Sequence, residues 1–179
     1  MKRRDLEHLI RAAGDIADDH EIVVIGSQAI LGSWPDAPED LLASVEADLF
    51  PKNHPERSDL IDGTIGEASP FHATFGYYGQ GVDRATATLP SGWESRLVAV
   101  RNDNTRGVTG WCLEPHDLLI SKYVAGREKD RVFTAAAART GRLSEATLLE
   151  RLAETDLSDE HRRRIAATIR RDFGTANSG

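Results

Sequence analysis

Two apolar runs that follow one another within residues 21–50 most constrain what this chain can fold into. The first, "EIVVIG", is a short continuous run that ends in Gly26-Ser27 and is typical of a strand buried on both faces. The second, "SVEADLF", alternates in character and stops at Pro51, which is typical of a strand with one polar face. Between them, "SQAILGSW" predicts a short helix capped by Ser27, before two prolines break the chain. We expect the two strands to be neighbours in one sheet.

The second strand carries two carboxylates, Glu46 and Asp48, whose i, i+2 spacing places them on the same face. Two carboxylates placed together repel each other, so solvent, basic residues or a divalent cation must offset their charge. Mg²⁺ prefers oxygen ligands and commonly takes one or two carboxylates together with substrate phosphates. Because a helix N-terminus at Ser27 would suit a phosphate, the combination predicts a nucleoside triphosphate site. The alternative is an exposed edge strand that carries protective charges.

Periodicity predicts the rest of the layout. Leu6, Ile10 and Ala13 form a helical stripe near the start, and residues 55–68 predict a second helix. Residues 70–113 are rich in aromatics, threonines and glycines, which favour strands and turns, with a hairpin in "RLVAVRNDNTRGVTGWCL". Beyond this region the pattern becomes helical, and Gly, Ser and Pro signals delimit helices near 115–126, 128–140, 144–153 and 158–173.

Length and composition exclude several classes of protein. The 179 residues are enough for one sizeable core, and no apolar run approaches the ~20 residues of a membrane span. The first residues read as an amphipathic helix and not as a signal peptide, so we expect a cytoplasmic protein without a membrane partner. Cys112 is the single cysteine, which excludes an intrachain disulfide and a metal site built from cysteines.

Charge is distributed unevenly along the chain, whose net charge is −7. Residues 1–113 carry 18 acidic and 10 basic side chains, whereas residues 114–179 carry 11 acidic and 12 basic ones. The acidic total argues against broad nonspecific binding to nucleic acid. "EHRRRIAATIRRDF" nevertheless groups five arginines on one predicted helix, which is either a solvated face or a local basic surface.

The Gly26-Ser27 turn, the helix and the acidic-x-acidic strand together resemble the DNA polymerase β-like nucleotidyltransferases. The resemblance implies an α/β (α+β) fold, a mixed β-sheet with flanking helices followed by a C-terminal helical region. It also implies Mg²⁺-dependent transfer of a nucleoside monophosphate from a nucleoside triphosphate to an acceptor hydroxyl. By this resemblance, Glu46 and Asp48 match the metal carboxylates, and Gly26 and Ser27 match the turn that holds the nucleotide phosphates.

A second stretch, "PHDLLISKYVAGREKDRVF", resembles the helical segment of the abortive-infection (AbiEii/MenT-like) toxin branch of that superfamily. The resemblance implies that Lys122 contacts the triphosphate, and that Asp130 is a general base or a structural residue. It also implies a toxin of a toxin–antitoxin pair, with tRNA as the first acceptor to consider and a cognate antitoxin as a protein partner. Without this resemblance, Lys122 would be interpreted as a surface lysine whose aliphatic stem packs on apolar residues, and Asp130 as part of a surface ion pair.

The expected organisation is a nucleotidyltransferase core over 1–113, with the helical region 114–179 packed on it. The alternative function is a catalytically silent member of the same fold that binds a partner protein. Two features favour it: Glu46 stands where an aspartate is usual, and no third carboxylate is obvious, Asp83 and Glu114 being weak candidates. A hydrolase is disfavoured, because no nucleophile constellation of serine, cysteine or histidine is visible.

Overall fold

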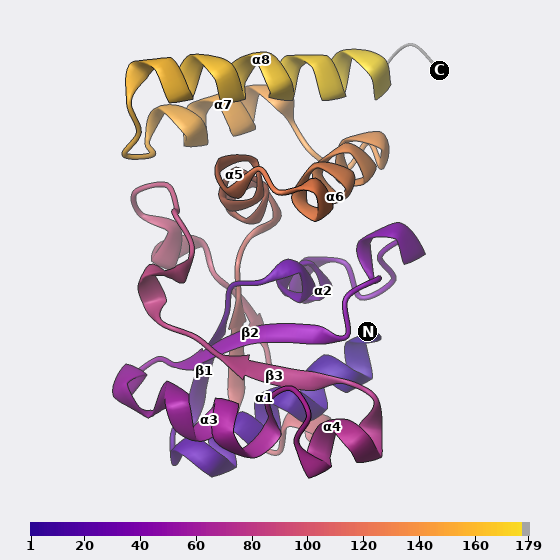
Figure 1. Ribbon diagram of the computed structural model, residues 1–179, viewed down its shortest axis with the longest axis vertical. Coiled ribbons are helices and arrows are strands. Elements are labelled where there is room, and N and C mark those ends of the chain that lie inside the picture. Colours follow the sequence, from indigo (N-terminus) through magenta and orange to yellow (C-terminus); the bar gives the residue numbers. More distant parts are fainter. Residues whose placement is uncertain (177–179) are drawn as a thin grey trace. The chain divides into compact units, whose positions relative to one another are not determined.

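The computed structural model describes residues 1–176, and the chain divides into two compact units. The first unit contains Met1–Thr86 and Arg96–Glu114, and the second contains Ala87–Ser95 and the chain from Pro115 onward. We call them the sheet unit and the helical unit. A short segment ahead of the β-hairpin therefore belongs with the C-terminal helices, although the sequence places it inside the strand-rich region. Figure 1 shows the elements of both units.

The described residues of the sheet unit form a five-stranded mixed sheet with the order β3-β2-β1-β5-β4. β1 runs antiparallel to β2 and parallel to β5, β2 runs parallel to β3, and β4 and β5 form the antiparallel hairpin. The mixed sheet with flanking helices and a helical C-terminal region confirms the predicted fold class. The strands are β1 Glu21–Val24, β2 Glu46–Pro51, β3 Tyr78–Gly81, β4 Val98–Val100 and β5 Thr109–Cys112.

Helices α1 (Arg3–Ala17) and α3 (Ser58–Ile65) cover one face of this sheet. The predicted stripe of α1 is fully buried, since its leucine, isoleucine and alanine side chains have no exposed surface. Glycines let the helices approach closely: a methyl group on Gly110 would overlap Ile10, and one on Gly79 would crowd Leu49 and Ile65. Leu49 therefore points toward the α1 and α3 face, which fixes the direction of every other β2 side chain.

The segment after β1 packs against β2, β4 and β5, and it forms a 3-10 turn, Ser27–Ala29, that continues into α2 (Ile30–Ser33). A methyl group on Gly32 would overlap the Cβ of Cys112, so α2 also approaches the sheet closely. Cys112 itself is fully buried, and burial raises the pKa of its thiol to about 12. The cysteine is therefore a packing residue and not a nucleophile.

The helical unit contains the helices that the sequence predicts, with boundaries shifted by at most a few residues. Ser144 caps α7 through a bond from the Thr147 amide, and the Ser158 hydroxyl accepts from the His161 amide at the start of α8. Gly141 has the positive φ of a residue that follows a helix end. The helices are α5 Pro115–Ala125, α6 Glu128–Arg139, α7 Glu145–Ala153 and α8 Asp159–Ala176.

One predicted segment is wrong in type. Residues 70–75 were expected to belong to strands and turns, but they form helix α4, Pro70–Phe75. Its N-cap, Ser69, accepts a bond from the His72 amide, and Gly76 closes it with a positive φ of 75°. Among residues 1–176, no helix combines the length and apolar character needed to cross a membrane.

Candidate active site

The Gly26-Ser27 turn leaves β1 on the side of the sheet that faces away from α1 and α3. The Ile25 amide bonds to the Asp48 carbonyl at 3.1 Å, so the turn begins beside the middle of β2. Gly26 has an extended backbone and is the N-cap, and Ser27 is the first residue of the 3-10 turn. The prediction that Ser27 caps the helix is therefore wrong, because the cap position falls on Gly26 and no side chain fills it.

Glu46 and Asp48 project from β2 on the same face as this turn. Ala47 and Leu49 alternate with them and are fully buried against the opposite face, whereas both carboxylates are half-buried. Asp48 lies so close to the Gly26 Cα that any side chain at position 26 would overlap its carboxylate. The antiparallel register of β1 and β2 creates this contact, since it places Val24 opposite Leu49. An acid pair is thus held beside the Gly26-Ser27 turn, in which Gly26 is buried and Ser27 is half-buried.

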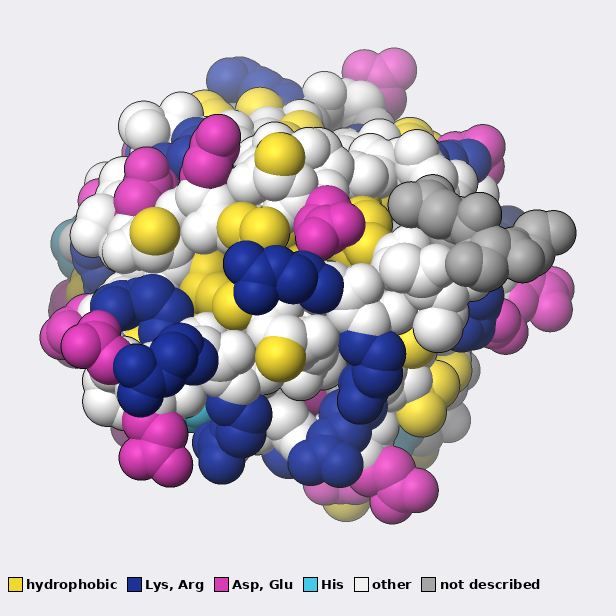
Figure 2. Space-filling view, turned by 90° about the horizontal axis from the view of Figure 1, so that it is seen from above, with side chains coloured by type: hydrophobic (Ala, Val, Ile, Leu, Met, Phe, Trp, Pro, Cys, Tyr) yellow, Lys and Arg dark blue, Asp and Glu magenta, His cyan; other side chains and the backbone are white. Residues whose placement is uncertain are grey.

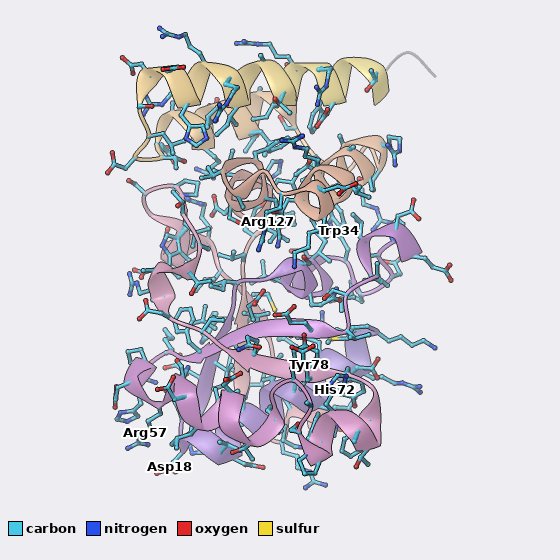
Figure 3. All side chains as sticks on the ribbon, viewed as in Figure 1. Asp18, Trp34, Arg57, His72, Tyr78 and Arg127 are labelled. Carbon is cyan, nitrogen blue, oxygen red and sulfur yellow. The ribbon has the colours of Figure 1, made fainter. Side chains whose placement is uncertain are left out.

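Tyr78 is a residue of this site that the sequence reading missed. The parallel pairing of β2 and β3 sets Tyr78 beside Glu46, and its hydroxyl hydrogen-bonds to the Glu46 carboxylate. Burial raises the pKa of Tyr78, and the charges of Glu46, Glu67 and Asp48 raise it further. The phenol therefore remains protonated and donates to Glu46. The His72 ring lies against the Tyr78 ring at a tilt of 45°, with centroids 4.7 Å apart, and both residues are labelled in Figure 3.

Gln28 is a second residue that the sequence did not single out. Its side chain has no exposed surface, and neither its amide nitrogen nor its amide oxygen has a hydrogen-bond partner among the described residues. A buried amide without partners costs ~1–3 kcal/mol. Gln28 follows Ser27 directly, so a polar side chain without hydrogen bonds lies in the chain segment next to the acid pair.

Lys122 and Asp130 come together in the helical unit. The Lys122 Nζ lies 3.6 Å from an Asp130 oxygen, and their side chains are only 8% and 2% exposed. Arg127 bonds the same carboxylate at 2.6 Å through Nε, with half of its own side chain in solvent. Burial alone would raise the pKa of Asp130, but the bonds from Arg127 and the charge of Lys122 hold it below its usual value. The expected ion pair of Asp130 is therefore confirmed, with Arg127 as its partner, but the expected surface location of Asp130 and Lys122 is wrong, because both are buried.

The arginines of α8 form an exposed basic face on the helical unit. Ile165 and Ile169 are buried beneath them, and Figure 2 looks onto this side of α8, where dark blue side chains are frequent. The underside of the helix is tied to α5, because the Tyr123 hydroxyl bonds to Asp172 at 3.2 Å. The exposed arginines are Arg163, Arg164, Arg170 and Arg171.

The candidate residues therefore fall into two groups. Gly26, Ser27, Glu46 and Asp48 gather in the sheet unit, and Lys122 and Asp130 pair within the helical unit. Of the weaker candidates for a third acid, Asp83 bonds the Ala85 amide as a turn residue, and Glu114 lies just after β5.

The donor set of the sheet unit fits Mg²⁺ better than a transition metal. Within residues 1–176, no group of three or more histidine, cysteine or acidic side chains is placed to hold a metal ion. A pair of carboxylates without further protein ligands is the arrangement in which substrate phosphates complete the coordination of Mg²⁺.

A mixed sheet with a Gly-Ser turn beside an acid pair on the neighbouring strand defines a nucleotidyltransferase-like fold. Over residues 4–175 the chain matches the family described as "Nucleotidyltransferase of unknown function (DUF6036)", and it belongs to that family. The match supports the nucleotidyltransferase superfamily and does not extend to the abortive-infection toxin branch. No curated protein and no solved structure matches the chain.

Proposed function

We propose that this protein is a Mg²⁺-dependent nucleotidyltransferase that moves a nucleoside monophosphate from a nucleoside triphosphate to an acceptor hydroxyl. The observation that carries the proposal is the contact of the Asp48 carboxylate with Gly26, with Glu46 on the same strand face. In the reaction, the acceptor oxygen bonds to the α-phosphorus, the bond to the β-phosphate oxygen breaks, and pyrophosphate leaves with the electron pair. The acceptor proton passes to solvent or a nearby base.

Glu46 and Asp48 would hold the cation, which supplies charge stabilisation to the phosphates when bound. Gly26 lets the Asp48 carboxylate approach the turn closely, because it presents no side chain toward Asp48. Ser27 adds a hydroxyl and the first amide of the 3-10 turn. Tyr78 orients Glu46 through its hydroxyl, so that the carboxylate keeps one conformation.

Within the helical unit, we assign Lys122 to the triphosphate, as the resemblance to the toxin branch suggests. Asp130 is better suited to position Lys122 than to accept a proton, because two cations lower its pKa and weaken it as a base. Arg127 is the exposed member of the cluster.

The acceptor and the biological setting are further parts of the proposal. The exposed arginines of α8 favour a polyanionic acceptor, and tRNA is the first RNA to test. By the resemblance of residues 115–133, the protein would act as a toxin neutralised by a cognate antitoxin. Two observations favour the alternative of a silent binding module: Tyr78 already bonds Glu46, and the described residues contain no group of three acids placed to hold a metal ion.

A transfer assay tests the proposal. The protein is incubated with Mg²⁺, each labelled nucleoside triphosphate and total RNA, and incorporation is compared among the wild type, Asp48→Asn and Asp59→Asn. Asp59 is an exposed acid on α3, so its variant removes one charge away from the site. We expect incorporation by the wild type and Asp59→Asn only. Incorporation by Asp48→Asn at the wild-type rate would refute the assignment, whereas binding of Mg²⁺ and nucleotide without any transfer would favour the silent module.

A further inference from the structure

A hollow of about 590 Å³ opens in the sheet unit near the start of α1, and the proposed reaction does not use it. It is bordered by the first three turns of α1, by the segment between α4 and β3, and by the turn of the β-hairpin. Its lining combines three cations with three aromatic rings, from Lys2, Arg4, Arg11, His8, Phe75 and Tyr77.

The aromatic wall is assembled from two separate parts of the chain. The His8 ring lies 4.8 Å from Phe75 in an edge-on arrangement, and Tyr77 lies 6.0 Å from each of these rings. The His8 Nδ1 and the Tyr77 hydroxyl are 2.8 Å apart, which fixes both rings. Phe75 remains 47% exposed, although it is large and apolar. An ordered ring in solvent beside other rings offers a flat surface for another aromatic group.

The cations stand at the rim of the same hollow. The Arg4 side chain is 77% exposed, and Arg11 is held by a bond of 2.8 Å to the Asn104 carbonyl. The acid in the lining, Asp5, is already engaged, since it accepts the Lys2 amide at 2.8 Å and lies 3.6 Å from Arg4. His8 adds little positive charge at neutral pH, because burial lowers its pKa. The net charge of the lining is positive although the whole chain is acidic.

We propose that this hollow binds single-stranded nucleic acid, with a base stacked on Phe75 and Tyr77 and its phosphate held by Arg4 and Arg11. Stacking rings combined with backbone cations are the features by which proteins hold single strands without reading their sequence. A cavity of this volume suits a ligand of nucleotide size. A duplex would not suit it, because paired bases cannot present their faces to the rings.

The hollow lies at the end of the sheet where Glu46 begins β2. Tyr77 lines the hollow, and the next residue, Tyr78, bonds Glu46. Tyr77 and Tyr78, where the chain enters β3, therefore point to opposite faces of the sheet: Tyr77 lines the hollow, and Tyr78 contacts the acid pair. Strand binding here requires neither Mg²⁺ nor a nucleoside triphosphate, so the inference stands apart from the transfer activity.

The test is fluorescence anisotropy with a labelled oligoribonucleotide of about ten nucleotides, within the site sizes of such platforms. EDTA is present and nucleoside triphosphates are absent, so failure of the transfer proposal would not affect the result. Phe75→Ala should weaken binding about tenfold, as expected for the loss of one stacked base. Leu60→Ala is the matched control, since Leu60 is a 52% exposed apolar residue on α3. Circular dichroism verifies that both variants are folded.

A second pair of variants tests the phosphate contacts. Arg4→Ala should weaken binding and make it less sensitive to salt, because one phosphate contact is lost. Arg139→Ala removes an exposed charge from α6 and should leave the affinity unchanged. Three results would each overturn the proposal: no binding by the wild type, equal affinities for Phe75→Ala and Leu60→Ala, or equal affinity for a duplex. Displacement of the strand by AMP at the same nucleotide concentration would also overturn it, in favour of a mononucleotide site.

Discussion

At the scale of single residues, Gly26 is the position where the Asp48 carboxylate leaves no room for a side chain. Its φ of −80° is open to any residue, so only the approach of Asp48 requires glycine. In Gly26→Ala the new methyl group must displace the Asp48 carboxylate. A shift of this kind at a reacting centre can cost about 100-fold in rate. We expect transfer to fall by about that factor while the fold persists, as measured by initial rates and circular dichroism.

The matched control is Gly63→Ala in α3. A methyl group at Gly63 would meet no atom within 4 Å, and the position is inside a helix. Alanine should therefore raise the free energy of unfolding by about 0.5–1 kcal/mol without changing transfer. Equal loss of transfer in both variants would show that the Asp48 contact has no catalytic importance.

The buried ion pair of Asp130 and Lys122 makes a prediction about stability and pH. Asp130→Asn leaves Lys122 buried without its carboxylate, which typically costs about 3–5 kcal/mol. Because the folded-state pKa of Asp130 lies below the ordinary value of 3.8, its contribution is present above that pH. It is lost as the pH falls through the folded-state pKa. Urea unfolding of the helical unit should show a deficit at pH 7 that shrinks below about pH 4; a deficit independent of pH would contradict this account.

Alternation along one strand was enough to predict that Glu46 and Asp48 share a face. The partners of these residues depend on strand pairing between distant segments, which a local pattern does not contain. Tyr78 reaches Glu46 only because β3 pairs with β2 in parallel, across about thirty residues of intervening chain. The burial of Lys122 could not be predicted either, because α5 is buried nearly all round, polar side chains included, and its periodicity does not mark an exposed side.

At the scale of elements, the capping residues at helix ends predicted helices better than the secondary-structure propensity of the residues between them did. All four C-terminal helices were predicted from Gly and Ser signals and from apolar spacing. The error at α4 has the opposite cause: the aromatics of "PFHATF" favoured strands, whereas the Ser69-Pro70 start and the Gly76 end determined a helix. Intrinsic propensity is a weak predictor of secondary structure. The strand propensity of these six residues is outweighed by the two satisfied helix caps and by packing against α3.

The cap of α7 gives a prediction at this scale. Ser144 accepts the Thr147 amide at 3.2 Å, so Ser144→Ala leaves an amide of the first turn without its partner. We expect the free energy of unfolding of the helical unit to fall by about 1 kcal/mol, measured by urea denaturation. Ser144→Asp keeps an oxygen acceptor and should behave like the wild type. Equal losses in the two variants would mean that the hydroxyl does not cap the helix.

At the scale of the whole molecule, a net charge of −7 conceals two local basic surfaces. The α8 face follows from one sequence segment and was visible in the sequence. The hollow of the sheet unit was not visible as a site, because its aromatic rings come from two distant segments and only the fold brings them together. Its cations all lie within residues 2–11, but charge counted along the chain does not show the rings that the fold places beside them. Net charge therefore constrains nonspecific binding and leaves specific sites open.

Ligand-dependent stability is the whole-molecule test of the proposed site, and it needs no knowledge of the acceptor. A ligand that binds only the folded protein stabilises it by about 2.7 kcal/mol at a concentration 100 times its Kd. If Glu46 and Asp48 hold Mg²⁺ for the triphosphate, a non-hydrolysable nucleoside triphosphate with Mg²⁺ should raise the melting temperature of the wild type. The same nucleotide with EDTA should raise it much less, and Asp48→Asn should remove the difference between the two conditions. Asp59→Asn should retain that difference, because its carboxylate lies on α3, which packs on the opposite face of the sheet. A nucleotide that stabilises Asp48→Asn as strongly as the wild type, with or without Mg²⁺, would place the triphosphate at a site other than the acid pair.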